Sequence, residues 1–369
     1  HLYKNNIKFF TGVPDSLLKD FCLCIEENIK EKNHIIAANE GNAVAIATGY
    51  HLSTGSLPLV YMQNSGFGNA LNPLISLCDP DVYSIPMLLA IGWRGEPGVL
   101  DEPQHVKQGT AQISLFEAIN MPYEIIAAED KGNYKSKINE LIEKAIYKNI
   151  PVALLIKKHT FEKYNTTHKI EESALMLREE ALYNILDSIK DGSIIVSTTG
   201  KTSREIFEIR KNYSQSHKMD FLNIGGMGHS SSIALGIAKS KPDRDVICID
   251  GDGSLFMHMG SLAVIASQRP MNFKYILINN KVHESVGGQD TAAKYIDIFS
   301  VADAFDSYRC FKVEKNEELV NSMNEFLECT GPAFMEVLVR PGSRKDLGRP
   351  SISPKKSKLD FMNYVKQKK

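Results

Sequence analysis

The chain of 369 residues is 43% hydrophobic and carries a formal net charge of -1 at pH 7. This length predicts two domains of ordinary size, each with its own hydrophobic core. The balanced charge gives no reason to expect a nucleic acid or membrane partner, and no apolar run approaches the roughly 20 residues that span a bilayer. Six scattered cysteines without a CxxC pair favour reduced thiols and a cytoplasmic location. Because the chain begins at His1 rather than at a methionine, a short targeting segment ahead of it stays open.

The first half alternates apolar strands with helical stretches, which predicts an α/β domain with a mostly parallel, doubly wound sheet over residues 1–165. After a strand that ends at Gly12, either Asp15 or Ser16 is expected to cap a helix. Residues 92–109 predict a long functional loop because they are rich in glycine, proline and charge. The polar stretch 157–174 predicts an interdomain linker. The other expected strands are 35–38, 57–61, 87–92, 123–126 and 152–156, and the clearest helices are 41–52 and 134–148.

The second half predicts another doubly wound α/β domain, over residues 176–340, followed by a basic C-terminal tail, 341–369, read as a solvated arm. The tail could alternatively fold over an acidic ligand. The expected strands are 193–197, 246–250, 273–278, 308–313 and 334–339, and the expected helices are 178–190, 255–268 and 317–329.

A Gly-Asp-Gly turn and an Asn-Asn pair follow two neighbouring strands of this second domain. In a right-handed βαβ unit both turns fall at the carboxyl ends of parallel strands, so Asp252 and Asn280 should face one crevice. A carboxylate, a carboxamide oxygen and backbone carbonyls suit Mg²⁺, which fills its remaining positions with phosphate oxygens and water. Gly251 and Gly253 allow the backbone to approach those phosphates. The sequence therefore predicts a metal-bridged diphosphate site.

The turn at residues 251–253, followed after 25 residues by Asn279-Asn280, resembles the thiamin diphosphate (ThDP) binding motif. This resemblance implies ThDP and Mg²⁺ as cofactors, with Asp252, the Asn280 side chain and the backbone carbonyl of Val282 as metal ligands. It also implies that the cofactor lies between the pyrimidine-binding domain of one chain and the diphosphate-binding domain of a partner. A homodimer or higher oligomer, without the middle domain of larger ThDP enzymes, is therefore expected.

Glu40 lies between an expected strand and a helix of small residues. Taken alone, it could simply favour the helix dipole. In ThDP enzymes a glutamate in this setting hydrogen-bonds N1′ of the aminopyrimidine, and Glu40 resembles it. Its implied role is to stabilise the 4′-imino tautomer, whose nitrogen removes the proton from thiazolium C2.

Two further turns are candidate cofactor contacts. Thr199 and Gly200 enter a helix whose N-terminus suits diphosphate oxygens. Met227 resembles the apolar residue that wedges beneath ThDP, although a plain core methionine stays open. His229 could reach the diphosphate or the substrate. The complete set of candidate cofactor residues is Glu40, Thr199, Gly200, Gly226, Met227, Gly228, His229, Gly251, Asp252, Gly253, Ser254 and Asn280.

An acidic substrate would need cationic and N–H donors, and each candidate has a structural or solvated alternative. His283 titrates near neutrality and could protonate an intermediate or bind an anion. With Glu40 and His105 it forms the candidate catalytic set. The candidate substrate contacts are Asp15, Ser16, Asn64, Ser65, Arg94, Lys107, Lys201 and Arg204.

Over nearly its whole length the chain is most similar to the phosphonopyruvate decarboxylase family of ThDP enzymes, with the sulfopyruvate decarboxylases as near relatives. The segments that carry this resemblance are 12–17, 39–43, 199–204, 226–229, 283–289 and 343–350. It implies a carboxy-lyase of phosphonate biosynthesis that converts phosphonopyruvate, a small 2-oxo acid, to phosphonoacetaldehyde and CO₂.

Three alternatives stay open at this point. The first is sulfopyruvate or another 2-oxo acid as the substrate, and the second is ThDP-dependent carboligation. The third is a non-catalytic α/β protein that binds a diphosphate nucleotide through Gly226-x-Gly228 and the Gly-Asp-Gly turn, although Ser231 stands where the dinucleotide fingerprint needs its third glycine.

Overall fold

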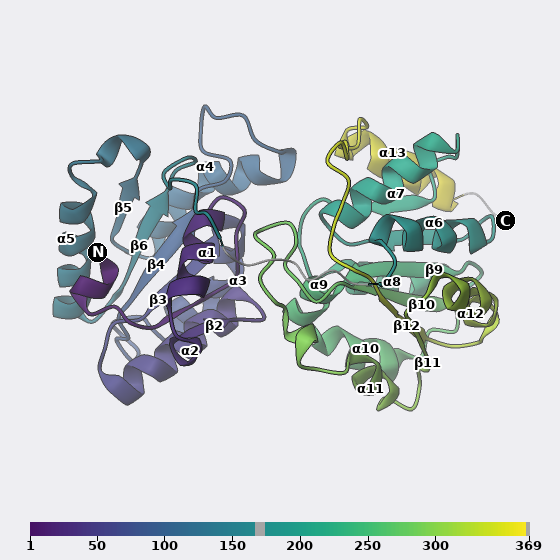
Figure 1. Cartoon of the computed structure of the whole chain (residues 1–369), viewed down its shortest axis with the longest axis horizontal. Helices are drawn as coiled ribbons and strands as arrows, with labels where there is room; N and C mark the ends of the chain where they lie inside the picture. Colours follow the sequence, from purple (N-terminus) through teal and green to yellow (C-terminus); the bar gives the residue numbers. More distant parts are fainter. Residues whose placement is uncertain (167–173, 367–369) are drawn as a thin grey trace. The chain divides into compact units, whose positions relative to one another are not determined.

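The computed structural model describes residues 1–166 and 174–366, which form two compact units (Figure 1). Unit 1 contains the described residues up to 166 together with Val286–Gln289, and unit 2 contains those from 174 to Ser285 and from Asp290 onward. The expected linker 157–174 therefore falls partly on residues 167–173, which lie outside the described residues. No helix in the described part of the chain is long and apolar enough to cross a membrane.

Unit 1 is built on a six-stranded sheet in which every strand pair is parallel, in the order β2-β1-β3-β4-β6-β5. The strands are β1 (Phe10–Gly12), β2 (His34–Ile36), β3 (Leu59–Gln63), β4 (Met87–Gly92), β5 (Tyr123–Ile126) and β6 (Pro151–Ile156). All residues of β4 and β6 are buried, as expected of central strands covered on both faces.

Helices cover both faces of this sheet, and successive residues of a strand enter different cores because side chains alternate across it. Val60 and Met62 of β3 pack with α2, α3 and α4 on one face, whereas Leu59 and Tyr61 pack with α1 and α5 on the other. The helices are α1 (Lys19–Asn28), α2 (Glu40–Thr54), α3 (Phe67–Ser76), α4 (Pro103–Ala118) and α5 (Tyr134–Lys148).

Unit 2 repeats the same architecture with an all-parallel sheet in the order β11-β12-β10-β9-β7-β8. Counted within each unit, both sheets have the strand order 2-1-3-4-6-5, read from opposite edges. The expected pair of doubly wound parallel sheets is thus confirmed. The strands are β7 (Ile194–Ser197), β8 (Asp220–Leu222), β9 (Val246–Gly251), β10 (Phe273–Asn279), β11 (Arg309–Val313) and β12 (Ala333–Leu338).

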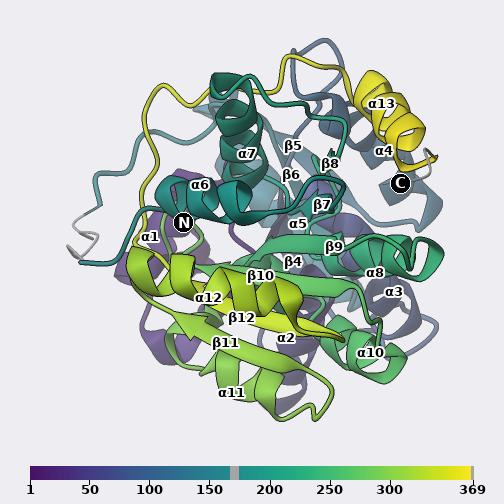
Figure 2. The same ribbon diagram turned by 90° about the vertical axis from the view of Figure 1, so that its right-hand side faces the viewer.

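The helices of unit 2 also lie on both faces of their sheet (Figure 2). One core packs α6, α7 and α12 against Ile247 and Ile276, and the other packs α8, α10, α11 and α13 against Cys248 and Tyr275. The helices are α6 (Arg178–Ser188), α7 (Lys201–Asn212), α8 (Ser230–Ser240), α9 (Asp252–Met257), α10 (Gly260–Gln268), α11 (Ile298–Asp303), α12 (Asn316–Glu328) and α13 (Pro354–Lys366). Short 3₁₀ helices lie at Leu2–Asn5, Glu31–Asn33, Asn64–Gly66, Ala128–Asp130 and Ala292–Lys294.

Four expectations about local structure were wrong. Neither Asp15 nor Ser16 caps the first helix, because α1 begins at Lys19 and its N-cap residue is Leu18. The loop 92–109 ends at residue 102, because Pro103 begins α4 at a position where its fixed φ favours a helix start. The helix 255–268 is two helices, α9 and α10, interrupted at His258 with φ -142° and ψ 48°. The tail is not wholly a solvated arm, since α13 buries Phe361 against Phe221 of β8, a short strand that the sequence pattern did not indicate.

Candidate active site

The Gly-Asp-Gly turn of unit 2 is buried at the point where β9 ends and α9 begins. Asp252 is 4% exposed, and its Oδ2 accepts a hydrogen bond from Thr291 Oγ1. Burial raises the pKa of Asp252 to about 6, although hydrogen bonds oppose the shift. A Cβ at Gly253 would lie 3.3 Å from the His283 ring and 3.4 Å from Met227 Cε. The structure therefore gathers the turn, Met227 and His283 at one place, as the sequence predicted.

The Asn-Asn pair lies at the same edge of the sheet as Asp252, because β9 and β10 are parallel neighbours with Ile278 opposite Gly251. Asn280 Oδ1 accepts a hydrogen bond from Val282 N at 3.2 Å, and Val282 O accepts one from Glu284 N at 2.9 Å. A carbonyl oxygen has two lone pairs, so each of these oxygens keeps one for a further ligand.

The oxygen atoms offered here fit a hard divalent cation that also binds phosphate. They come from one carboxylate, one carboxamide and one backbone carbonyl, at Asp252, Asn280 and Val282. Across the described residues no cluster of three or more His, Cys, Asp or Glu side chains is arranged to hold a metal. A site with a single protein carboxylate leaves most of an octahedron to phosphate oxygens and water, which is how Mg²⁺ is usually bound.

The glycine turn before α8 is tied to this site by both shape and hydrogen bonding. Gly228 has φ 88°, and a Cβ there would lie 2.6 Å from His258 Cδ2 and 2.8 Å from Met257 Cβ. Its N–H donates to Ser254 Oγ at 3.0 Å, which connects the turn to α9. Gly228 thus allows a close approach that residues with a side chain would prevent.

His229 and His258 form a stacked pair, with ring centroids 4.4 Å apart and an interplanar angle of 18°. His229 is exposed and is the residue directly before α8, whereas His258 lies at the break between α9 and α10. Burial, and then the neighbouring imidazole, lower the pKa of His258. Burial also lowers the pKa of His283 to about 4, so the expectation that it titrates near neutrality was wrong. His258 was missed because nothing in the sequence indicated that the helix breaks there.

The candidate cations of α7 have partners inside unit 2. Lys201 Nζ donates to Glu284 Oε1 at 2.7 Å. Arg204 donates to the carbonyl oxygens of Leu347 and Gly348 in the segment before α13. Thr199 and Gly200 lie directly ahead of α7, with Gly200 at its N-cap and at φ 89°. The two cations therefore help to hold loops, and neither is reserved for a substrate.

In unit 1, Glu40 is the first residue of α2 and is 5% exposed. Its Oε2 accepts a hydrogen bond from Asn69 Nδ2 at 2.8 Å, and burial raises the pKa of the carboxyl group. The carboxylate lies directly on Gly66, where an added Cβ would be 2.1 Å from Oε1. Asn39 caps the helix by accepting from Asn42 N at 2.9 Å. The carboxyl group is thus both fixed and shielded from water.

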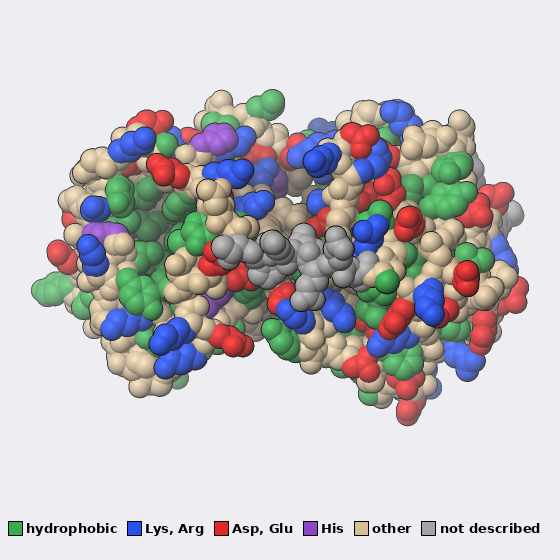
Figure 3. All heavy atoms as spheres, in the orientation of Figure 1, with side chains coloured by type: hydrophobic (Ala, Val, Ile, Leu, Met, Phe, Trp, Pro, Cys, Tyr) green, Lys and Arg blue, Asp and Glu red, His purple; other side chains and the backbone are tan. Residues whose placement is uncertain are grey.

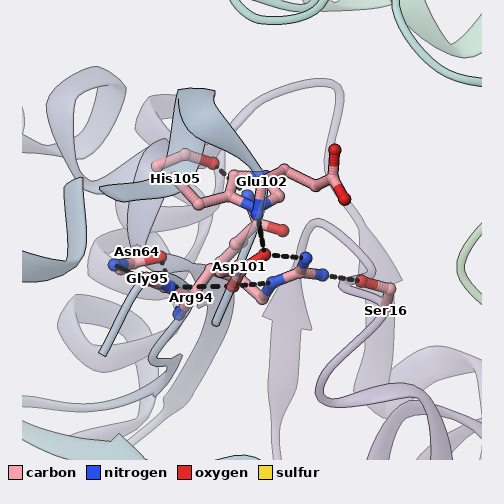
Figure 4. A network of polar contacts seen from close by, with 9 residues as sticks. Ser16, Asn64, Arg94, Gly95, Asp101, Glu102 and His105 are labelled. Atoms are coloured by element: carbon pink, nitrogen blue, oxygen red, sulfur yellow. Dashed lines mark hydrogen bonds and ion pairs between the residues drawn. The ribbon is translucent and has the colours of Figure 1, made fainter. Parts of the chain in front are cut away.

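Arg94 is the centre of a second polar cluster in unit 1 (Figure 4). It follows β4 and donates to Asp101 through Nε at 2.8 Å and Nη2 at 2.5 Å, while Nη1 donates to Ser16 Oγ at 2.9 Å. Asp101 also contacts His105 Nδ1 at 2.9 Å. Although burial opposes it, hydrogen bonds from Arg94 and His105 hold the pKa of Asp101 far below its ordinary value. Asp101 was missed because it lies in an irregular stretch with no recognisable spacing.

A cavity of about 270 Å³ lies beside this cluster, where residues that follow β1, β4 and β6 converge. Asn64, which follows β3, makes two hydrogen bonds with the backbone of Arg94. Its Nδ2 donates to the Arg94 carbonyl oxygen at 2.8 Å, and its Oδ1 accepts from the Arg94 N–H at 3.2 Å. Ser65 accepts from Gln63 Nε2 at 2.5 Å and does not line the cavity. Lys107 is exposed on α4 and is also absent from the lining. The polar lining side chains are Ser16, Asp20, Arg94, Glu96, Asp101, Lys158 and His159.

A larger cavity of unit 1, about 960 Å³, is mainly apolar and lies near the N-terminus, where Figure 3 shows hydrophobic side chains gathered in a hollow. Its lining includes Phe10, Phe21, Ile25 and Leu154, and it contains none of the candidate site residues. Volume alone therefore does not locate the chemistry in this unit.

Comparison with known proteins gives a consistent result for both units. Residues 1–115 match the N-terminal TPP binding domain of thiamine pyrophosphate enzymes, and residues 198–337 match the C-terminal TPP binding domain. The phosphonopyruvate decarboxylase of Streptomyces hygroscopicus is 30% identical, covering 96% of this chain and 89% of that protein. The chain belongs to the thiamine pyrophosphate enzyme family.

Two further relatives support this assignment. The phosphonopyruvate decarboxylase of Streptomyces viridochromogenes is 30% identical over 90% of this chain and 85% of its own length. The sulfopyruvate decarboxylase of Methanosarcina acetivorans is 27% identical over 99% of this chain and 96% of its own length. The family's cofactors, ThDP (thiamine pyrophosphate) and Mg²⁺, agree with the oxygen atoms offered at the sheet edge of unit 2, and a small-molecule substrate follows from the family.

Asp15 offers a test of how this ThDP enzyme buries charge near Arg94. It is 2% exposed, its Oδ2 accepts from Leu18 N at 3.2 Å, and a Cβ at Gly92 would lie 2.3 Å from the same oxygen. Burial raises the pKa of Asp15 from 3.8 to about 6. A raised folded pKa contributes stability that is present at low pH and lost as the pH rises through about 6.

We expect Asp15→Asn to stabilise unit 1 at pH 7.5 by up to about 3 kcal/mol, because the amide keeps the acceptor for Leu18 N without a charge. At pH 5 the stabilisation should be roughly 1 kcal/mol smaller, because Asp15 of the wild type is then largely protonated. Urea unfolding followed by the fluorescence of Trp93, the single tryptophan, measures this in unit 1. An equal or lower stability of the variant at pH 7.5 would contradict the burial penalty.

Proposed function

We propose that this enzyme decarboxylates phosphonopyruvate to phosphonoacetaldehyde and CO₂. The observation that carries the proposal is its 30% identity, over nearly the whole chain, to two proteins named phosphonopyruvate decarboxylase. The sulfopyruvate decarboxylase relative is less similar at 27% and makes sulfopyruvate the second candidate. Membership in a ThDP family removes the nucleotide-binding alternative.

In the proposed reaction the bond between the carboxylate and the keto carbon breaks, CO₂ leaves, and one proton is taken up in its place. Bound ThDP supplies the electron sink for this step. Asp252, Asn280 and Val282 O would hold Mg²⁺ and, through it, the diphosphate. Met227 and Gly253 would form the surface beneath the cofactor. Glu40 would hold a proton on its buried carboxyl group, where its pKa is raised, and share it with the pyrimidine ring.

We also propose that the cavity beside Arg94 binds an acidic group of the substrate. Arg94 and Lys158 supply positive charge, His159 supplies an imidazole ring and Ser16 a hydroxyl group, and open α/β sheets bind ligands at the carboxyl ends of their strands. Asp101 holds the guanidinium by two hydrogen bonds and turns Nη1 toward Ser16. Lys201 and Arg204 are weaker candidates, since neither lines this cavity and each holds a loop of unit 2.

Replacement of Arg94 by Met should raise KM for phosphonopyruvate about 100-fold and leave kcat largely unchanged, because a lost charged contact weakens ground-state and transition-state binding alike. Steady-state kinetics of CO₂ release measure both constants. Lys144→Met, an exposed change on α5, is the matched control for lost charge. A KM for Arg94→Met equal to that of Lys144→Met would place the substrate elsewhere.

The substrate is tested by CO₂ release from the purified protein with ThDP and Mg²⁺, supplied in parallel with phosphonopyruvate, sulfopyruvate and pyruvate. The proposal expects a strong preference for phosphonopyruvate that disappears when ThDP is left out. A preference for sulfopyruvate would make sulfopyruvate, and not phosphonopyruvate, the substrate. Product formation only after an aldehyde acceptor is added would indicate a carboligase.

We infer that the active enzyme is a homodimer or a higher oligomer in a reducing compartment such as the cytoplasm. All six cysteines are free, which supports the compartment. Glu40 and the metal ligands belong to different units, so a shared site predicts complementation between inactive variants. Mixed chains of Glu40→Gln and Asp252→Ala should regain about one quarter of the activity if each site combines two chains. Light scattering measures the assembly itself.

A further inference from the structure

Four charged side chains from three separate segments meet beside the Asn-Asn pair of unit 2. Arg178 binds Glu205 through Nε at 2.7 Å and Nη2 at 2.8 Å, and reaches Glu284 Oε2 through Nη1 at 2.7 Å. Lys201 Nζ donates to the other carboxylate oxygen of Glu284, Oε1, at 2.7 Å. The side chains of Arg178, Glu205 and Glu284 are 7%, 0% and 10% exposed. Two cations and two anions balance, so the cluster holds Glu284 without adding net charge.

Glu284 also fixes the orientation of Asn280. Asn280 Nδ2 donates to Glu284 Oε2 at 3.0 Å, while Oδ1 on the other side accepts from Val282 N at 3.2 Å. A carboxylate can only accept, so a rotated amide would place its oxygen against Glu284 and its NH₂ group against a backbone N–H. Only one of the two orientations of the amide is therefore compatible with its surroundings.

Asn279 shows the same arrangement one residue earlier. Its Nδ2 donates to Glu336 Oε1 at 2.7 Å, and its Oδ1 accepts from Lys281 N at 3.0 Å. Asn279 is 1% exposed, however, and Lys281 adopts a left-handed φ of 62°, so this first pair shapes the turn. Asn280 is less buried, and its fixed oxygen lies at the sheet edge that also carries Asp252.

We propose that Glu284 is a positioning residue for the divalent cation, which directs the oxygen of Asn280, and not its nitrogen, toward the metal. Arg178 and Lys201 hold the Glu284 carboxylate in place from two sides. The inference rests on the proposed ligands Asp252, Asn280 and Val282. A partner of a metal ligand typically changes metal affinity 10- to 100-fold when it is replaced.

The first test is Glu284→Gln, because the glutamine amide can present either an oxygen or an NH₂ group to Asn280. Isothermal titration of Mg²⁺ into protein saturated with ThDP should show a dissociation constant raised by about 10- to 100-fold. Asp220→Asn is the matched control, since it breaks another buried ion pair of unit 2, with Arg210 at 3.2 Å, and leaves the metal loop intact. Its Mg²⁺ affinity should stay unchanged.

The second test is Asn280→Asp, alone and combined with Glu284→Gln. A carboxylate at position 280 presents oxygen in either orientation, but it repels Glu284 and is satisfied by the NH₂ group of a glutamine. The double variant should therefore bind Mg²⁺ more tightly than either single variant.

Equal losses of Mg²⁺ affinity in Glu284→Gln and Asp220→Asn would overturn the proposal, and so would additive effects in the double variant. Asp252→Ala distinguishes a failure of the positioning role of Glu284 from a failure of the proposed metal site. If Asp252→Ala loses Mg²⁺ binding while Glu284→Gln does not, the positioning role fails and the ligands stand. If Asp252→Ala binds Mg²⁺ normally, the proposed metal site itself is wrong.

Discussion

Replacement of Glu40 by Gln should lower kcat by a factor of about 10² to 10⁴ while ThDP and Mg²⁺ still bind. Glu40 is 5% exposed, and burial raises the pKa of its carboxyl group, so a proton is held there at a higher pH than an exposed glutamate allows. A glutamine of the same shape keeps the contact with Asn69 but cannot exchange a proton. The expected defect is therefore in catalysis and not in folding.

Two measurements separate these effects. Steady-state CO₂ release gives kcat, and the rate at which the C2 proton of bound ThDP exchanges with deuterium reports cofactor activation directly. Glu143→Gln, on the exposed face of α5, is the control for a lost carboxylate in the same unit. If Glu40→Gln turns over at a near wild-type rate, the assignment of Glu40 to cofactor activation is wrong.

The part of this site that sequence reasoning located is the part determined by neighbouring strands. The residues after β9 and β10 meet because parallel strands that pair directly place their carboxyl ends together, and here Ile278 lies opposite Gly251. The spacing from the Gly-Asp-Gly turn to the Asn-Asn pair follows from the helical crossover after β9 and the length of β10. The proximity of Asp252 to the turn that carries Asn280 and His283 could thus be predicted without coordinates, whereas Met227 was expected there only from its resemblance to the residue beneath ThDP.

The charged partners of the site could not be predicted, because ion pairs between distant segments have no sequence period. Arg178 and Glu284 are 106 positions apart, and Arg178 is the first residue of a helix whose apolar pattern says nothing about its partners. Asp101 likewise lies in an irregular stretch, seven positions from Arg94. Such contacts depend on where whole elements pack.

Both sheets have the same strand order, and this equivalence places the two polar clusters at comparable positions. In unit 2 the third and fourth strands, β9 and β10, lead into Asp252 and Asn280. In unit 1 the third and fourth strands, β3 and β4, lead into Asn64 and Arg94, which bind each other through the Arg94 backbone. One architecture therefore presents oxygen ligands in one unit and a cation in the other, and only the residues after the strands decide which.

Replacement of Asp252 by Ala should raise the dissociation constant of ThDP measured with Mg²⁺ by at least about 100-fold, because the metal would lose the only carboxylate among its proposed protein ligands. Asp252→Asn is the informative companion. It keeps an oxygen that can accept from Thr291, and it removes a negative charge that burial makes costly without a metal, as the pKa of about 6 indicates.

The stability of Asp252→Asn without metal and its affinity for Mg²⁺ should therefore change in opposite directions. Without Mg²⁺ its unfolding temperature should equal or exceed that of the wild type, whereas its Mg²⁺ affinity should fall. A carboxylate that served only the fold would leave the Mg²⁺ affinity unchanged, so the loss of affinity distinguishes a ligand from a structural carboxylate. Differential scanning calorimetry without metal and titration calorimetry with Mg²⁺ measure the two quantities. Unchanged Mg²⁺ affinity in both variants would remove Asp252 from the metal site and, with it, the crevice between the β9 and β10 turns as the place where the diphosphate binds.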